Sequence, residues 1–237
     1  MSHIIIRKLF GYRIKLTPLD SCELISVGSL MNNALEVVEN NNVAVWGSGF
    51  IQEGRDNDLR NISKFKFHAV RGPITKDRLS LTNVILGDPA LLTNLIIKPS
   101  KKKVSKIGVI PHYADAHLEL IKMIEQDNRF IIIDPLHSPK KVIQQISSCS
   151  LVLSSSLHGL ILSDTYSIPN MWLHLSDNLM GNEYKFKDYF SSINRTLESA
   201  NLDKIFDQIY LDKIKKNYIP IKNLASIQQD LINSFPY

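Results

Sequence analysis

The chain has 237 residues, 44% of them hydrophobic and 22% charged, an ordinary globular composition with enough apolar residues for one large core or two small ones. The formal net charge of +5 and the pI of about 9.1 favour anionic partners: a phosphorylated small molecule, an acidic membrane surface or nucleic acid. No apolar run reaches the length of a membrane span, and residues 1–10 lack the features of a signal peptide. Because Cys22 and Cys149 lie in no metal or redox spacing, we expect a reduced, cytoplasmic setting.

The first half of the chain holds three short apolar runs, each followed by a turn signal. The runs are Leu24–Val27, Val43–Trp46 and Val84–Leu86, and the turn signals include Gly47-Ser48-Gly49 and Gly87-Asp88-Pro89. Such runs predict short buried strands that end in loops. The residues Gly47, Ser48 and Gly49 allow a ligand to approach the backbone closely, although the stretch is too short for a dinucleotide-binding motif.

A basic, low-complexity stretch at 98–106 (KPSKKKVSK) separates the two halves. It predicts an N-terminal α/β lobe at 1–97, a hinge at 98–106, a C-terminal α/β lobe at 107–200, and C-terminal helices at 201–237 that pack back on the body. The lysines of the hinge are most simply solvated, because no aromatic residues lie among them to suggest contact with nucleic acid.

Strands and helices alternate regularly in the second half. Apolar runs predict strands at Ile107–Ile110, Phe130–Ile133, Leu151–Leu153 and Met171–Leu173, with helices at about 114–126 and 139–147 and a third after residue 156. This alternation predicts Rossmann-like α/β lobes with parallel sheets and helices on both faces. Ligands of such sheets bind at the carboxyl ends of the strands, so we expect the loops GSGF, GDPAL, PHY and SSSLHG to face one cleft.

The segment that follows the predicted strand Leu151–Leu153 is the strongest candidate for an anion site. Ser154, Ser155 and Ser156 lead into a helix whose first turn carries His158, and a helix N-terminus presents free N–H groups to an anion. We expect Ser156 to cap this helix. His158 is expected to act as a general acid or as a neutral donor to phosphate; the alternative is a histidine bonded to a neighbouring carbonyl.

Two further residues after a strand carry candidate chemistry. His112 follows a strand and a proline, so it is expected at the edge of the sheet, where it would bind phosphate or move a proton; a structural histidine is nearly as good an explanation. Asp115 most simply caps the next helix, and the alternative is a base for an acceptor hydroxyl.

Two cations complete the set of candidates. The planar guanidinium of Arg71 suits a carboxylate or a phosphate, and its place before Gly72-Pro73 suggests a displayed side chain; the alternative is a surface salt bridge. Lys185 is expected either to reach an anionic ligand or to face the solvent.

Six motifs, in order along the chain, resemble those of the bacterial polysaccharide pyruvyl transferases. The resemblance covers roughly Val27 to Tyr189. A single motif would be weak evidence for a family, but six motifs in the same order are strong evidence. The segments that carry it are Val45–Phe50 (VWGSGF), Val70–Pro73 (VRGP) with Asp77, Arg78 and Leu79, Leu86–Leu92 (LGDPALL), Val109–Tyr113 (VIPHY) with Asp115, Ser154–Gly159 (SSSLHG) and Tyr184–Tyr189 (YKFKDY).

The resemblance implies two lobes like those of the GT-B glycosyltransferases and a ketal-pyruvyl transfer in surface polysaccharide synthesis. It implies phosphoenolpyruvate as donor, a sugar or lipid-linked saccharide diol as acceptor, no metal, no cofactor and no nucleic acid, with possible peripheral contact at the inner face of the cytoplasmic membrane. In these terms His158 and His112 are catalytic. The substrate-binding residues are then Arg71, Ser154, Ser155, Ser156, Leu157, Gly159, Lys185, Gly47, Ser48 and Gly49.

The chain departs from the family pattern at its start. Members usually begin with a strand and an Asn-Phe-Gly-Asp-type loop, whereas this chain opens with MSHIIIRKLFGYRIKL, so we expect a shortened N-terminal lobe. Two other functions stay open. One is a GT-B-type glycosyltransferase using a nucleotide sugar, for which no ribose or base recognition groups are evident, and the other is a non-catalytic relative that binds an anion or a carbohydrate.

Overall fold

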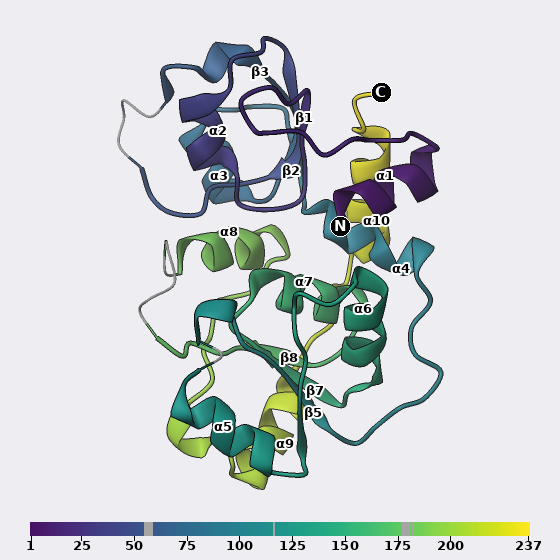
Figure 1. The fold of residues 1–237 in the computed structure, drawn as a ribbon, viewed down its shortest axis with the longest axis vertical. Coiled ribbons are helices and arrows are strands. Elements are labelled where there is room, and N and C mark those ends of the chain that lie inside the picture. The colour runs from purple at the N-terminus through teal and green to yellow at the C-terminus, as the bar shows by residue number, and fades with distance from the viewer. Residues whose placement is uncertain (55–58, 116, 177–180, 182) are drawn as a thin grey trace. The chain divides into compact units, whose positions relative to one another are not determined.

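The computed structural model describes residues 1–54, 59–115, 117–176, 181 and 183–237. The chain divides into two compact units (Figure 1). Unit 1 comprises Met1–Leu92, Met180–Leu197 and Asn223–Tyr237, and unit 2 comprises Thr93–Leu179 and Glu198–Lys222. Each unit has a four-stranded sheet whose strand pairs are all parallel, which confirms the predicted α/β class. No helix in the described ranges is long and apolar enough to cross a membrane.

The sheet of unit 1 has its strands in chain order, β1-β2-β3-β4. They are β1 Leu24–Ile25, β2 Val43–Ser48, β3 Phe65–Val70 and β4 Ile85–Leu86. Strand β2 is buried along its whole length, as its apolar run predicts. The sequence prediction missed β3 because its residues, FKFHAV, are only partly buried and form no continuous apolar run.

The structure describes five α-helices in unit 1. Helix α10, from the C-terminal end of the chain, packs against β4 and against the 3₁₀ turn Pro89–Leu92, which α1 also contacts. The indole Nε1 of Trp46 in β2 donates a hydrogen bond of 2.9 Å to the carbonyl of Leu231 in α10. The helices are α1 Ser2–Phe10, α2 Met31–Val37, α3 Pro73–Arg78, α8 Tyr184–Ser192 and α10 Leu224–Asn233.

The sheet of unit 2 has the order β6-β5-β7-β8. Its strands are β5 Ile107–Ile110, β6 Phe130–Ile132, β7 Leu151–Ser154 and β8 Asn170–Trp172, each within a residue or two of its prediction. The helices are α4 Thr93–Ile96, α5 Glu119–Gln126, α6 Pro139–Ser148, α7 Leu157–Thr165 and α9 Gln208–Asn217. Helices α6 and α7 contact each other, while α5 packs on β6 and α9 on β8 (Figure 1).

The strand order of unit 2 contains a reversal of direction. The chain leaves β5 for β6 on one side and later returns to β7 on the other side. Connections that diverge in this way open a crevice at the carboxyl ends of the two central strands, where ligands of such sheets bind. The loops that follow β5 and β7 border this point. The described strands of unit 1 follow one another without such a reversal.

The two units differ from the consecutive segments expected from the sequence. Residues 98–106, expected as a hinge, belong to unit 2 and are bonded to α6: Ser100 N–H donates to Ser147 Oγ at 2.8 Å, and Lys103 Nζ donates to the Ser147 carbonyl at 2.7 Å. The predicted C-terminal helices at 201–237 divide between the units, since α9 lies in unit 2 and α10 in unit 1. The residues of helix α8 fall within the predicted C-terminal lobe at 107–200, but they lie in unit 1.

Candidate functional site

Two hydrogen bonds hold together the loops that follow β5 and β7 in unit 2. The Ser155 N–H donates to the carbonyl of Ile110 at 3.0 Å, and the His112 N–H donates to the hydroxyl of Ser155 at 2.6 Å. Because these loops flank the reversal in strand order, the structure brings the two predicted catalytic motifs of this unit to one edge of its sheet.

Ser154 and Gly159 hold helix α7 against the end of the sheet. The Ser154 hydroxyl is completely buried, accepts from the Ser156 N–H at 3.0 Å and lies 2.8 Å from the Ser156 carbonyl as donor. A Cβ atom at Gly159 would lie 2.2 Å from Ser154 Oγ and 2.9 Å from Cδ1 of Ile110. The contacts of both residues are therefore with the protein, and they set the position of the first turn of α7.

The first turn of α7 presents Ser156, Leu157 and His158. Ser156 occupies the N-cap position, but its hydroxyl makes no capping hydrogen bond, so the expected cap is not formed. Its carbonyl accepts from the N–H groups of Gly159 at 3.0 Å and Leu160 at 3.4 Å. This hydroxyl is half-buried and has no hydrogen-bond partner among the described residues. Leu157 is buried and His158 is half-buried. A hydroxyl and an imidazole thus lie at the positive end of a helix dipole.

His112 is half-buried beside this turn and its ring is oriented by the backbone. Its Nδ1 accepts a hydrogen bond of 3.3 Å from the Ala114 N–H. An accepting Nδ1 places the proton of the neutral imidazole on Nε2. In its neutral form His112 therefore carries its ring proton on Nε2.

Asp115 is completely buried and does not cap α5. That helix begins at Glu119 with Leu118 as its N-cap, so the expected cap is wrong; a 3₁₀ turn at Tyr113–Asp115 precedes it, and residue 116 lies outside the described residues. Oδ1 of Asp115 accepts from the Ser176 hydroxyl at 2.6 Å, and Oδ2 has no hydrogen-bond partner in the described ranges. Sequence reasoning missed Ser176, whose only signal is a polar side chain soon after a predicted strand.

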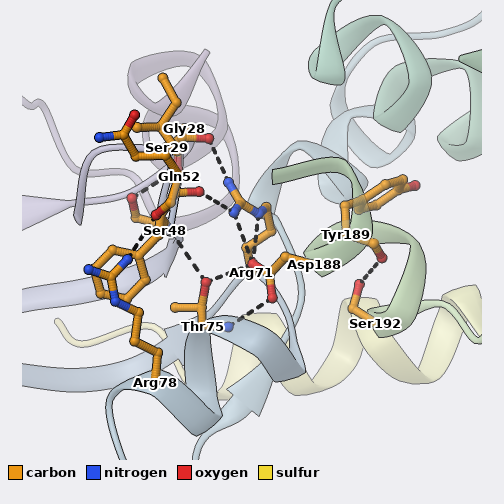
Figure 2. Close-up of polar contacts among 12 residues, drawn as sticks. Gly28, Ser29, Ser48, Gln52, Arg71, Thr75, Arg78, Asp188, Tyr189 and Ser192 are labelled. Atoms are coloured by element: carbon orange, nitrogen blue, oxygen red, sulfur yellow. Dashed lines mark hydrogen bonds and ion pairs between the residues drawn. The ribbon is translucent and has the colours of Figure 1, made fainter. Parts of the chain in front are cut away.

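In unit 1 the predicted anion ligand Arg71 is the centre of a buried network (Figure 2). The guanidinium is completely buried rather than displayed, and each nitrogen donates to the protein. Nε donates to Asp188 Oδ2 at 2.9 Å, NH1 to the Ser29 hydroxyl at 2.6 Å, and NH2 to the Phe50 carbonyl at 2.6 Å. The same carboxylate accepts from the backbone N–H of Thr75 at 2.9 Å and from its hydroxyl at 2.7 Å. Arg71 therefore joins the loops after β1, β2 and β3 to helix α8.

The Gly47-Ser48-Gly49 stretch also contacts protein groups. Gly47 has a φ of +86°, and a Cβ there would lie 2.1 Å from Cδ of Pro89. A Cβ at Gly49 would lie 2.6 Å from Cζ of Arg71, so this glycine makes room for the guanidinium. The buried Ser48 hydroxyl donates to the Gly28 carbonyl at 2.9 Å.

Lys185 of α8 is buried beside the network, with 8% of its surface exposed. Burial lowers the pKa of its ammonium, and the nearby positive charge of Arg71 lowers it further. Its Nζ lies 5.4 Å from the ring centroid of Phe186, and no carboxylate among the described residues pairs with it. By contrast, Lys187 on the same helix is exposed and pairs with Glu183. Lys185 is thus a buried cation without a counter-charge of its own in the described part of the chain.

The predicted site residues therefore fall into two groups, one in each unit. Unit 2 brings together His112, the three serines, Leu157, His158 and Gly159, and unit 1 brings together Gly47, Ser48, Gly49, Arg71 and Lys185. Within the described residues, no group of three or more His, Cys, Asp or Glu side chains is placed to hold a metal ion. Sequence reasoning missed Asp188 as the partner of Arg71, although it lies in the YKFKDY motif.

Comparison with known proteins identifies the family. The model of the family described as polysaccharide pyruvyl transferase matches residues 2–176, and the chain belongs to this family. One relative is the succinoglycan biosynthesis protein ExoV of Rhizobium meliloti (strain 1021), 29% identical over 175 residues that cover 73% of this chain. Another is the uncharacterised protein L143 of Acanthamoeba polyphaga mimivirus, 30% identical over 189 residues that cover 72% of this chain.

The matched region is only part of each relative. It spans 54% of the length of ExoV and 62% of the length of L143. No solved structure showed significant similarity to the chain.

Proposed function

We propose that this protein transfers the pyruvyl group of phosphoenolpyruvate onto two hydroxyls of a sugar in polysaccharide synthesis. The observation that carries the proposal is the position of His158 and the Ser156 hydroxyl in the first turn of α7, beside His112, where the strand order of unit 2 reverses. An anion is favoured at this helix end, and a proton donor lies with it. Membership of the family and the succinoglycan role in the name of ExoV support the proposal.

The chemistry assigns a proton transfer to His158. In its protonated form it donates to the methylene carbon of phosphoenolpyruvate, and the adjacent carbon becomes an oxocarbenium-like centre. One sugar hydroxyl attacks that carbon and loses its proton, the carbon–oxygen bond to phosphate breaks, and the second hydroxyl attacks the same carbon. Of the two protons that the diol loses, one restores His158 and the other leaves on phosphate, so a pyruvate ketal and inorganic phosphate are the products.

The remaining residues of unit 2 bind the donor in this proposal. The Ser156 hydroxyl and the backbone N–H of Leu157 donate to phosphate oxygens, and the Nε2–H of His112 donates to the same anion or returns a proton. Ser154, Ser155 and Gly159 position the turn through their contacts with the protein. Asp115 and Ser176 are candidates to form a hydrogen bond with a hydroxyl of the acceptor.

In unit 1 we propose that Lys185 binds an anion. Its charge has no carboxylate partner among the residues that the structure describes, whereas the donors of Arg71 are already engaged with Asp188, Ser29 and Phe50. Arg71, with Gly47, Ser48 and Gly49, is a positioning residue in this proposal. A sugar or lipid-linked saccharide would be the acceptor, with the reaction in the cytoplasm.

Isothermal titration of phosphoenolpyruvate and a phosphate-release assay with a panel of diol-containing glycosides test the proposal. We expect wild type to bind the donor, and Ser156→Ala to weaken binding by about five- to tenfold, the loss of one charge-assisted hydrogen bond. His158→Gln should keep donor binding within about threefold and lose at least about a hundredfold in phosphate release. Lys187→Gln removes an exposed cation of unit 1, is the control and should bind as wild type does.

Other results would contradict the proposal. A folded wild type that binds a nucleotide sugar but not phosphoenolpyruvate would favour the glycosyltransferase alternative. Donor binding without phosphate release from any glycoside would favour a non-catalytic relative.

A further inference from the structure

The first nineteen residues carry an uncompensated positive charge. Residues 1–19 contain no Asp or Glu and four cations, Arg7, Lys8, Arg13 and Lys15. All four side chains are exposed, and none has an ion-pair or hydrogen-bond partner in the described part of the chain. Some exposed lysines elsewhere do have an acidic partner, such as Lys122 with Glu119 at 3.2 Å. The positive charge of this region is therefore fully available to an external anion.

Large apolar side chains alternate with these cations. Tyr12, Ile14 and Leu16 are 48%, 40% and 97% exposed, and Arg13 and Lys15 lie between them. A single exposed apolar residue is ordinary, but three that alternate with basic residues form the combination that binds bilayer interfaces. We refer to residues 7–16 as the basic–apolar segment.

The basic–apolar segment is rooted in the core of unit 1. Ile5 and Ile6 of α1 are completely buried, and the Phe10 ring stacks on Phe235 with centroids 3.8 Å apart. The Tyr12 ring lies 6.0 Å from that of Phe235. Gly11, with a φ of 79°, ends α1, so the segment leaves the helix immediately after this anchor. An anchored segment loses less conformational entropy on binding than a free tail.

The acidic residues nearest in the sequence lie outside the basic–apolar segment. The first acid in the sequence is Asp20, and Glu23 lies near the C-terminal end of unit 1, where its carbonyl accepts from the Tyr237 hydroxyl at 3.3 Å. We infer that the basic–apolar segment binds the surface of an anionic lipid bilayer, with its cations at lipid phosphates and Tyr12, Ile14 and Leu16 in the interfacial layer. The inference stands on unit 1 alone and does not depend on the proposed pyruvyl transfer.

Co-sedimentation with vesicles tests the inference. Wild type should bind vesicles of phosphatidylcholine mixed with phosphatidylglycerol, bind pure phosphatidylcholine at least about tenfold more weakly, and dissociate as salt is raised. Arg13→Gln/Lys15→Gln should weaken binding to the mixed vesicles by about tenfold or more. Ile14→Ser/Leu16→Ser should also weaken it, because the apolar side chains no longer enter the interface.

Matched controls separate the segment from general charge and hydrophobicity. Lys101→Gln/Lys102→Gln removes two exposed cations from unit 2, and Leu136→Ser with Ile209→Ser removes two apolar side chains that are 79% and 82% exposed. Both controls should bind mixed vesicles as wild type does. The inference is overturned if wild type binds mixed vesicles no more tightly than pure phosphatidylcholine vesicles, or if the controls lose as much vesicle binding as the segment variants. It is also overturned if the chain binds single-stranded RNA but does not bind vesicles.

Discussion

Arg71 and Asp188 form a completely buried ion pair although 117 residues separate them in the sequence. Oδ2 of Asp188 lies 2.9 Å from both Nε and NH2 of the guanidinium, and the rest of the carboxylate is satisfied by Thr75. Gly72 permits this approach, since a Cβ there would lie 2.0 Å from the Asp188 carbonyl oxygen. The VRGP and YKFKDY motifs are thus in contact through this ion pair and together stabilise unit 1.

The change Asp188→Asn should strongly destabilise unit 1. It leaves the buried guanidinium without a counter-charge, and removing one partner of a buried pair costs about 3–5 kcal/mol. The chain has two tryptophans, Trp46 in unit 1 and Trp172 in unit 2, so a Trp172→Phe background makes fluorescence report unit 1. Urea unfolding in that background measures the loss. The matched control Glu183→Gln breaks the exposed pair with Lys187 and should leave the urea midpoint of unfolding nearly unchanged. If Asp188→Asn and Glu183→Gln lowered the stability equally, the buried pair would stabilise unit 1 no more than an exposed pair does.

Local patterns were sufficient to predict the four strands of unit 2 and its helices α5, α6 and α7, although not α4. The run Ile107–Ile110 is continuous, buried and bounded by a basic stretch and Pro111, so its limits could be read directly. Helix α1 was not predicted because its three consecutive isoleucines favour strand as much as helix and no capping side chain marks its start. Helices α8 and α10 belong to unit 1 because of contacts between residues that are distant in the sequence. One such contact joins Trp46 and Leu231, which are 185 positions apart.

For the candidate site, the sequence predicted which loops carry chemistry but not what their side chains contact. The SSSLHG loop lies at the carboxyl end of β7 as expected, because a strand followed by small polar residues and a helix has this geometry. The hydrogen bond from His112 to Ser155, and the ion pair that occupies Arg71, depend on which strands become neighbours. Sequence spacing contains no information on either.

The change Gly159→Ala should destabilise unit 2, although alanine is normally the better helix former. The added methyl would lie 2.2 Å from Ser154 Oγ, and relieving such overpacking costs about 1–3 kcal/mol against a gain of about 1 kcal/mol from helix propensity. Urea unfolding followed by Trp172 fluorescence in a Trp46→Phe background measures the change. In a Ser154→Ala background the same substitution should cost less, because the nearest atom is gone; an unchanged or increased stability of Gly159→Ala itself would contradict the packing.

Unit 2 should lose stability as the pH rises from about 9 to about 11. Burial raises the pKa of the Cys149 thiol to about 11 and that of the Tyr166 phenol to about 12. The ordinary pKa values are 9.0 for the thiol and 10.0 for the phenol. At a pH between the ordinary and the raised pKa of a group, the unfolded chain has released a proton that the folded chain keeps. The free energy of unfolding is therefore highest below pH 9 and falls as the pH rises above 9.

The change Cys149→Ala isolates the contribution of the thiol. Its free energy of unfolding should fall less than that of the parent between pH 8 and pH 11, by roughly 2 kcal/mol. Urea unfolding under reducing conditions, with Trp172 as reporter in the Trp46→Phe background, gives both slopes. Parallel pH dependence in the two proteins would mean that the thiol is not protected from ionisation in the folded state.

The change Leu231→Ala should unfold unit 1 more readily, even though the residue lies at the far end of the chain from the sheet that it supports. The Leu231 side chain is completely buried, and its carbonyl accepts the hydrogen bond of Trp46 at 2.9 Å. Truncating a buried leucine leaves a cavity and costs about 2–5 kcal/mol. Urea unfolding with Trp46 as reporter, in the Trp172→Phe background, measures this loss. Gln229→Ala, exposed on the same helix, should change stability by less than about 0.5 kcal/mol. If Leu231→Ala lowered the free energy of unfolding no more than Gln229→Ala does, α10 would not be part of the core of unit 1.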